Sequence, residues 1–326
     1  MSNEWVRSII QHYNIGHTII QVDELESGFQ SDNYRVLTDK GNFVIRILHD
    51  TAENITYAMN VYNYLASHGV KTPQPQLTKQ NNLVLPHEGK IIVIQTFLEG
   101  SAYYEDENLE KVDQFLPLYG RELGRVHQVL LQMVADQGTE RLSKRQDTVS
   151  YVKEAGLKYM PDIAYIDDQY KLWKEDISKL PCNELTRAVI HGDVGPKDFF
   201  FKDDVFSGIL DFNAASYDYL LFDIASMMMY CGLYGQERSS EYTSFIKAYL
   251  SESPVKKDEL KWLHIILRTR WLLQVFYHQY RYVKGITQGL ETAKAEENLQ
   301  GVKDGVYFLK VTGTLPDDYF YTIITL

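Results

Sequence analysis

The sequence predicts an α+β protein with two lobes: a small N-terminal lobe with an antiparallel sheet and a larger, mainly helical C-terminal lobe. Residues 34–97 have the pattern of paired strands around one helix, the segments after them carry apolar residues at helical spacing, and the pattern changes near residue 98. A chain of 326 residues, of which 44% are hydrophobic, is long enough for each lobe to bury its own core. We therefore expect lobes at residues 1–97 and 98–326.

The N-terminal lobe contains a predicted order of hairpin, helix and hairpin. Residues 34–48 alternate and then run apolar around the turn-forming segment 39–42, which predicts a β-hairpin. Apolar residues three and four positions apart predict a helix over residues 52–68. Two short apolar segments, 83–85 and 91–97, flank a turn-like sequence and predict a second pair of strands.

The C-terminal lobe is predicted from helical periodicity. Its longest apolar stripe runs from Leu109 to Leu130. Further helices are predicted over residues 148–159, 169–178, 219–234, 241–250 and 260–283. Lysine and arginine interrupt the last of these segments, so a buried helix is favoured over a membrane span. Residues 1–10 lack the features of a signal peptide.

Composition restricts the classes of ligand and compartment. The chain has 33 basic and 44 acidic residues, and its net charge of -11 argues against nucleic acid as a partner because phosphate backbones would be repelled. A cationic or zwitterionic substrate suits this charge better. Two cysteines, Cys182 and Cys231, provide neither a disulfide framework nor metal-ligand spacing, which favours the cytoplasm. No membrane partner is expected, and the oligomeric state stays open.

Three aspartates form the pattern with the clearest chemical meaning. Two apolar segments end at Asp193 and Asp211, and Asp198 lies five residues after the first. A single aspartate near a loop is usually a turn or capping residue. Phosphoryl transfer, however, needs one carboxylate to accept the proton of the attacking hydroxyl and further oxygens to hold Mg²⁺. The spacing therefore favours Asp193 as the base, with Asp198 and Asp211 as metal ligands.

These residues lie in a segment that resembles a known family signature. Residues 191–225 contain a His-Gly-Asp loop, an oxygen ligand five residues later, an Asp-Phe strand end and a downstream Asp-Ile-Ala, and they resemble the aminoglycoside phosphotransferase/choline kinase superfamily. Residues 119–127 are similar to the helix before the catalytic region in that family, and residues 97–100 to its interlobe hinge. The resemblance implies a bilobal protein-kinase-like fold and the transfer of phosphate from ATP, with Mg²⁺, to a hydroxyl of a small molecule.

Within the superfamily, two segments are similar to bacterial homoserine-kinase-like enzymes. Residues 28–34 resemble the nucleotide loop of those enzymes, and residues 211–223 resemble their metal-binding segment. The resemblance implies that Gly28, Ser31 and Asn33 contact the nucleotide. A glycine such as Gly28, taken alone, is more often a turn residue.

Two further nucleotide contacts are expected in the N-terminal lobe. Arg46 occupies the strand position at which kinases place a phosphate-binding lysine, and its guanidinium can hold two phosphate oxygens. An alternative is an edge-strand arginine that faces water. The backbone from Thr96 to Leu98 is the expected partner of the adenine ring.

Three departures from the family pattern leave a second hypothesis open. Asp198 replaces the usual asparagine, Arg46 replaces lysine, and Ala58 stands where a glutamate usually pairs with that lysine. Asp198 still offers oxygen to Mg²⁺ but adds a negative charge near the phosphates. The alternative is therefore a catalytically weak kinase-like protein that binds nucleotide or metabolite and regulates a partner.

The expected acceptor is a small molecule. The sequence after Asp211 has neither the glycine nor the Ala-Pro-Glu segment of protein kinases. Arg268 and Trp271, three residues apart on one helical face, are the predicted acceptor contacts, and Arg268 could bind a carboxylate. Aromatic core packing with a surface arginine is the alternative for this pair. Homoserine is the first acceptor to test, followed by choline or ethanolamine and then aminoglycosides.

Overall fold

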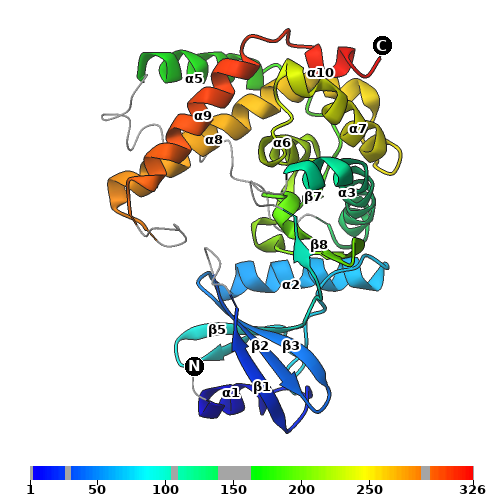
Figure 1. The fold of residues 1–326 in the computed structure, drawn as a ribbon, viewed down its shortest axis with the longest axis vertical. Helices are drawn as coiled ribbons and strands as arrows, with labels where there is room; N and C mark the ends of the chain where they lie inside the picture. Colours follow the sequence, from blue (N-terminus) through cyan, green and yellow to red (C-terminus); the bar gives the residue numbers. More distant parts are fainter. Residues whose placement is uncertain (1–2, 26–30, 104–108, 139–162, 288–293, 326) are drawn as a thin grey trace. The chain divides into compact units, whose positions relative to one another are not determined.

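The computed structural model describes residues 3–25, 31–103, 109–138, 163–287 and 294–325 (Figure 1). The predicted helix over 148–159 and the predicted contact Gly28 lie outside the described residues. The chain folds into two compact units. The first consists of Met1–Ala102 with Lys197–Ala215, and the second of Tyr103–Pro196 with Ser216–Leu326.

The first unit is organised around an antiparallel sheet of five strands. Their order in the sheet is β1-β2-β3-β5-β4, so β3 is central and the predicted hairpin of residues 34–48 is confirmed as β2 and β3. The expected second pair appears as β4 and β5, shifted by one or two residues. The elements are α1 (Asn3–Ile10), β1 (Ile19–Glu24), β2 (Ser31–Thr38), β3 (Gly41–Leu48), α2 (Ala52–Ser67), β4 (Leu85–His87) and β5 (Lys90–Thr96).

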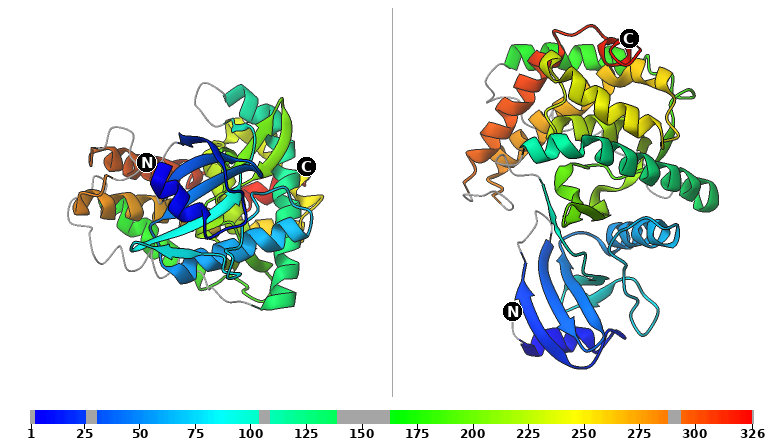
Figure 2. Two further views of the ribbon diagram at one scale, coloured as in Figure 1. Left: turned by 90° about the horizontal axis from the view of Figure 1, so that it is seen from below. Right: turned by 45° about the vertical axis from the view of Figure 1, so that its right-hand side comes forward.

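Strand alternation gives this sheet two different faces. One face packs against α1, as Figure 2 also shows, through a core that includes Ile9, Val36 and Ile45. Successive side chains of a strand point to opposite faces. Arg46 therefore points away from this core. Asn33, which is paired directly with Arg46 across β2 and β3, points to the same face of the sheet. Polar side chains are thus concentrated on the face that α1 does not cover.

A second, three-stranded sheet joins two distant parts of the sequence within the first unit. It consists of β6 (Ser101–Ala102), β8 (Phe199–Lys202) and β9 (Val205–Ile209), in the order β6-β8-β9. At Gly100, which has φ +108°, a Cβ would lie 2.2 Å from the carbonyl oxygen of Phe201, so only glycine allows this approach. This pairing extends the first unit beyond residue 97 and brings residues 197–215 into it.

The second unit is mainly helical, as predicted. Two short strands, β7 (Arg187–Ile190) and β10 (Ser216–Tyr219), pair within it, and β10 ends at the first residue of the helix that was predicted over 219–234. The helices are α3 (Leu109–Gln137), α5 (Ile163–Ile177), α6 (Leu221–Tyr230), α7 (Ser239–Leu250), α8 (Leu263–Lys284), α9 (Glu297–Thr312) and α10 (Tyr319–Thr322). A 3₁₀ turn, Lys257–Trp262, precedes α8 where the sequence predicted helix from residue 260.

Close helix packing in this unit depends on glycines. A Cβ at Gly120 of α3 would lie 2.3 Å from the carbonyl oxygen of Phe245 in α7, and one at Gly305 of α9 would lie 2.6 Å from Val275 Cγ2 in α8. Because a methyl group does not fit in either place, both helix pairs are held at short separation. Within the described ranges, no helix is both long and apolar enough to span a membrane.

Candidate active site

In the second unit, β7 leads into the loop that carries Asp193. Gly192 has φ +92°, a conformation that favours glycine. The backbone N–H of His191 donates to Oδ2 of Asp223 at 2.7 Å, and the N–H of Gly192 donates to Oδ1 at 2.8 Å. Asp223 lies in the first turn of α6. One carboxylate therefore fixes two successive peptide groups directly before Asp193.

Asp223 is fully buried and stays ionised through its hydrogen bonds. Burial acts to raise its pKa, but the hydrogen bond and charge of His127, the charge of His191 and the Gly192 N–H outweigh burial and lower the pKa below its usual value. Nε2 of His127 lies 3.0 Å from Oδ2 of Asp223, and its Nδ1 lies 2.7 Å from the hydroxyl of Tyr249. This chain of buried groups ties the loop to α3 and α7.

Asp193 itself is positioned by two donors and remains open to solvent. The hydroxyl of Tyr230 donates to Oδ1 at 3.0 Å, and Nη2 of Arg270 donates to the same oxygen at 2.8 Å. The Asp193 side chain is 42% exposed, whereas that of Arg270 is 9% exposed. A Cβ at Gly195 would lie 2.6 Å from the Tyr230 ring, so the glycine leaves room for this tyrosine. The carboxylate is thus fixed but reachable.

Of the residues around Asp193, the sequence predicted neither Tyr230 nor Arg270. Leu263, Ile266 and Leu267 place Arg270 on a buried apolar stripe of α8. An arginine at such a position is unusual, because a buried charge needs a partner. That signal was present in the sequence, but the partner could not be deduced from it.

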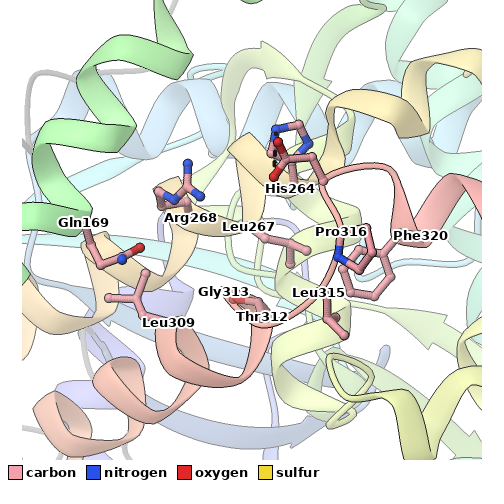
Figure 3. Close-up of a pocket in the computed structure, with 11 residues that line it drawn as sticks. Gln169, His264, Leu267, Arg268, Leu309, Thr312, Gly313, Leu315, Pro316 and Phe320 are labelled. Carbon is pink, nitrogen blue, oxygen red and sulfur yellow. Dashed lines mark ion pairs between the residues drawn. The ribbon is translucent and has the colours of Figure 1, made fainter. Parts of the chain in front are cut away.

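The two predicted acceptor contacts lie elsewhere on α8. Arg268 forms an ion pair with Asp176 of α5 and lines a small cavity of about 40 Å³ together with Gln169 and His264 (Figure 3). Trp271 is completely buried and packs against aromatic rings, including Phe308 at 4.8 Å between centroids. Neither residue forms a hydrogen bond or ion pair with Asp193. Positions 268 and 270 are roughly 200° apart around a helix, so Arg268 points away from the side of α8 that carries Arg270. Core packing, the alternative for Trp271, describes this conformation.

The first unit gathers three of the predicted residues, Ser31, Asn33 and Asp211, around Arg46. Its Nε donates to Asn33 Oδ1 at 3.2 Å, its Nη2 lies 3.5 Å from Ser31 Oγ, and Nη2 also lies 3.9 Å from Asp211 Oδ1. Nη1 donates to Gln95 Oε1 at 3.3 Å. Arg46 is 13% exposed and lies on the central strand β3, so the alternative of an edge-strand arginine facing water is wrong.

Asp211 lies two residues after β9 in a left-handed backbone conformation. Its φ of 71° belongs to the left-handed region, which costs an L-residue about 1–2 kcal/mol. The Tyr62 hydroxyl accepts the N–H of Asp211 at 2.7 Å, and Asn213 Nδ2 donates to Oδ1 at 2.7 Å. Burial, the largest influence, raises the pKa of Tyr62 to about 12. The Asp211 side chain is 44% exposed, so a carboxylate is presented to solvent on a fixed backbone.

Asp198 is connected to the same part of the first unit. It ends the 3₁₀ turn Pro196–Asp198, and its carbonyl oxygen accepts the N–H of Leu210, the residue before Asp211, at 2.9 Å. Its side chain is almost fully buried. Mg²⁺ is commonly held by one or two carboxylates together with substrate phosphates. The donor set of Asp198 and Asp211 fits that requirement.

The segment predicted to contact adenine has a defined hydrogen-bond pattern. The N–H of Thr96 donates to the carbonyl of Gln74 at 2.9 Å, and the N–H of Phe97 donates to the carbonyl of Asn42 at 3.0 Å. The N–H of Leu98 has no acceptor among the described residues. Leu98 is therefore the one of these three residues whose amide is open to a ligand.

Comparison with known proteins identifies the family. The family model described as "Phosphotransferase enzyme family" matches residues 21–262. The chain belongs to this family. It is 27% identical over 274 residues to a homoserine kinase of Brucella anthropi, and the match covers 80% of this chain and 79% of the relative. It is 26% identical over 284 residues to a homoserine kinase of Brucella ovis, with 83% and 82% covered. The chain is a small-molecule kinase.

Solved structures agree on the fold. An amicoumacin kinase, hAmiN, in complex with AMP-PNP, Ca²⁺ and Ami superposes with a TM-score of 0.72 at 16% identity, and 97% of this chain and 95% of that chain are covered. A choline/ethanolamine kinase family protein from Mesorhizobium loti gives a TM-score of 0.70 at 12% identity, with 99% of each chain covered. The expected kinase-like α+β fold is thereby confirmed.

Proposed function

We propose that the protein transfers a phosphoryl group from ATP to a hydroxyl group of a small molecule, with Asp193 as the base. The supporting observation is the setting of this carboxylate. It is held by Tyr230 and Arg270, follows two peptide groups fixed on Asp223, and is still 42% exposed. Phosphoryl transfer depends mainly on such positioning, because the acceptor hydroxyl must be oriented and its proton accepted.

The residues around Arg46 have the chemistry to bind a nucleotide. The guanidinium of Arg46 contacts the neutral side chains of Ser31 and Asn33. It can bind phosphate oxygens in place of these partners or in addition to them. In our proposal Gly28 belongs to the same phosphate-binding loop. In the same proposal the open N–H of Leu98, two residues after Thr96, donates to the adenine ring.

Asp198 and Asp211 are the proposed metal ligands. When bound with the nucleotide, Mg²⁺ neutralises part of the charge on the transferring phosphate. The protein's contribution is to hold the carboxylates: the Leu210 hydrogen bond ties Asp198 to the β9 end, and Tyr62 fixes the backbone of Asp211. Arg46, 3.9 Å from Asp211, balances part of the negative charge that two aspartates bring.

Homoserine is the acceptor that we propose first, because the relatives that align over most of this chain are homoserine kinases. Choline or ethanolamine follows, and then the aminoglycosides, since spectinomycin phosphotransferase shares the fold with a TM-score of 0.65. We also propose a cytoplasmic location, in keeping with two free cysteines, Cys182 and Cys231.

The test is ADP release from purified protein with Mg²⁺, ATP and each acceptor in turn. Asp193→Asn is expected to reduce kcat on the best acceptor by about 10²–10⁴-fold, the usual contribution of a general base. Asp203→Asn is the matched control, because Asp203 lies exposed in the β8–β9 turn and asparagine tolerates its φ of 51°. Unchanged turnover in Asp193→Asn, or no Mg²⁺-dependent ATP binding, would contradict the proposal.

A weak or regulatory kinase-like protein is the second candidate. Two observations favour it: Ala58 is buried in α2 and offers no glutamate to Arg46, and Arg46 already has several side-chain partners. Such a protein would show nucleotide-dependent or metabolite-dependent melting shifts without ADP release. The same acceptor panel, read by both methods, distinguishes the two candidates.

A further inference from the structure

Arg270 is a buried cation beside the proposed base. Its Nη2 donates to Asp193 Oδ1 at 2.8 Å, and its Nε donates at 3.2 Å to Oγ of Ser226, a residue of α6 with no exposed surface. Its guanidinium carbon lies 5.8 Å from the centre of the Tyr230 ring. Three contacts from α6 and the Asp193 loop therefore fix the guanidinium plane.

The hydrogen-bond capacity of Arg270 is not used up by these contacts. A guanidinium carries five N–H donors, and the two contacts above use one N–H of Nη2 and that of Nε. Nη1 has no hydrogen-bond acceptor among the described residues. It is also not fully buried. The side chain keeps 9% of its area exposed, so Nη1 can reach solvent. It belongs to the same guanidinium group that donates to Asp193.

The charge of Arg270 would act in opposite ways on cationic and anionic acceptors. A cationic acceptor that brings its hydroxyl to Asp193 would place a positive charge beside a fixed, poorly hydrated guanidinium and be repelled. An acceptor with a carboxylate would gain a charge-assisted hydrogen bond at Nη1. The charge of Arg270 also acts on groups that it does not contact. Burial is the largest cause that lowers the pKa of His278, and the charge of Arg270 adds to this effect.

We propose that Arg270 determines acceptor specificity by binding a carboxylate of the acceptor through Nη1 while Asp193 contacts the acceptor hydroxyl. The expected substrate class is a short hydroxy acid or hydroxy amino acid. The acceptor must be short, because the guanidinium that carries Nη1 is hydrogen-bonded directly to the Asp193 carboxylate. This inference rests on the proposed kinase function and narrows it to anionic acceptor groups.

The experiment compares two probes that differ in charge at one position, L-homoserine and its carboxamide, by kcat/KM with saturating ATP and Mg²⁺. The wild-type protein should prefer the acid. In Arg270→Gln the ratio of acid to amide should fall by about 10- to 100-fold, the usual value of a hydrogen bond between charged groups. Arg270→Lys keeps the charge and should retain part of the preference.

Two further variants keep the test independent of folding. Ser226→Ala leaves the charge of Arg270 in place but removes its Nε partner, so KM for the acid should rise severalfold with little change for the amide. Arg238→Gln also removes a partly buried arginine, one that pairs with Asp113, and should leave the ratio unchanged. Melting temperature and its shift with ATP confirm that each variant is folded.

The outcomes separate this inference from the proposed function. Equal losses for acid and amide in a folded Arg270→Gln protein would mean that Arg270 only positions Asp193 and would overturn the inference. Turnover of choline or an aminoglycoside without turnover of any hydroxy acid would overturn it too, while the kinase function stands. Absence of ADP release with every acceptor would refute the proposed function itself.

Discussion

Replacement of Asp223 by asparagine tests how the loop before Asp193 is held. The carboxylate accepts hydrogen bonds from His191 N, Gly192 N and His127 Nε2 at 2.7, 2.8 and 3.0 Å, and it is fully buried. Asparagine has one acceptor oxygen, and its NH₂ group would face a donor. Loss of one partner of a buried, charged network typically costs about 3–5 kcal/mol. We expect that loss in the free energy of unfolding, with a large fall in kcat.

The assay is urea unfolding at pH 7, with ADP release measured on the same samples. The pKa of Asp223 is lowered in the folded protein, so its contribution is present above its usual value of 3.8 and is lost only as the pH falls through the lowered pKa. Asp113→Asn is the control, because that aspartate pairs with Arg238 while partly exposed and should cost about 1 kcal/mol or less. If Asp223→Asn is no less stable than this control, the three hydrogen bonds do not anchor the loop.

Two further predictions concern Tyr230 and His278. Tyr230→Phe removes one of the donors to Asp193, and we expect kcat to fall about tenfold with unchanged stability; an unchanged kcat would show that the hydroxyl does not position the base. Burial is the main cause that lowers the pKa of His278 below 6.5, so the unfolded state binds more protons and stability falls as the pH decreases from 7. In His278→Gln the free energy of unfolding, measured with denaturant, should fall less steeply with decreasing pH, by at most about 1.4 kcal/mol per pH unit. Equal slopes for the variant and the wild-type protein would contradict the lowered pKa of His278.

Local patterns in the sequence predicted most of the helices and strands. The alternation around residues 39–42 predicted the β2–β3 hairpin, and its register places Asn33 opposite Arg46. Ser31, expected from the family resemblance, and Asp211, expected as a metal ligand, lie beside Arg46 in the structure, and their proposed roles stay predictions. The hairpin prediction succeeded because strand periodicity is a local property.

The residues around Asp193 depend on tertiary packing and could be predicted only in part. The helix over 260–283 was recognised, but which of its faces meets α6 depends on packing that a single sequence does not reveal. Consequently Arg268 and Trp271 were chosen, whereas Arg270, between them, contacts Asp193. The pairing of β6 with β8 was missed for a similar reason, since two residues of strand give no periodic signal.

The split composition of the first unit has a consequence for the order of events during synthesis. Its last piece, Lys197–Ala215, leaves the ribosome only after the intervening segment that belongs to the second unit. At ordinary translation rates the interval between Ala102 and Ala215 is roughly 5–20 s. During that interval β6 has no strand to pair with, and Arg46 lacks its acidic neighbour Asp211. The five strands β1 to β5 are made early, but the first unit as a whole stays incomplete until two-thirds of the protein has been synthesised.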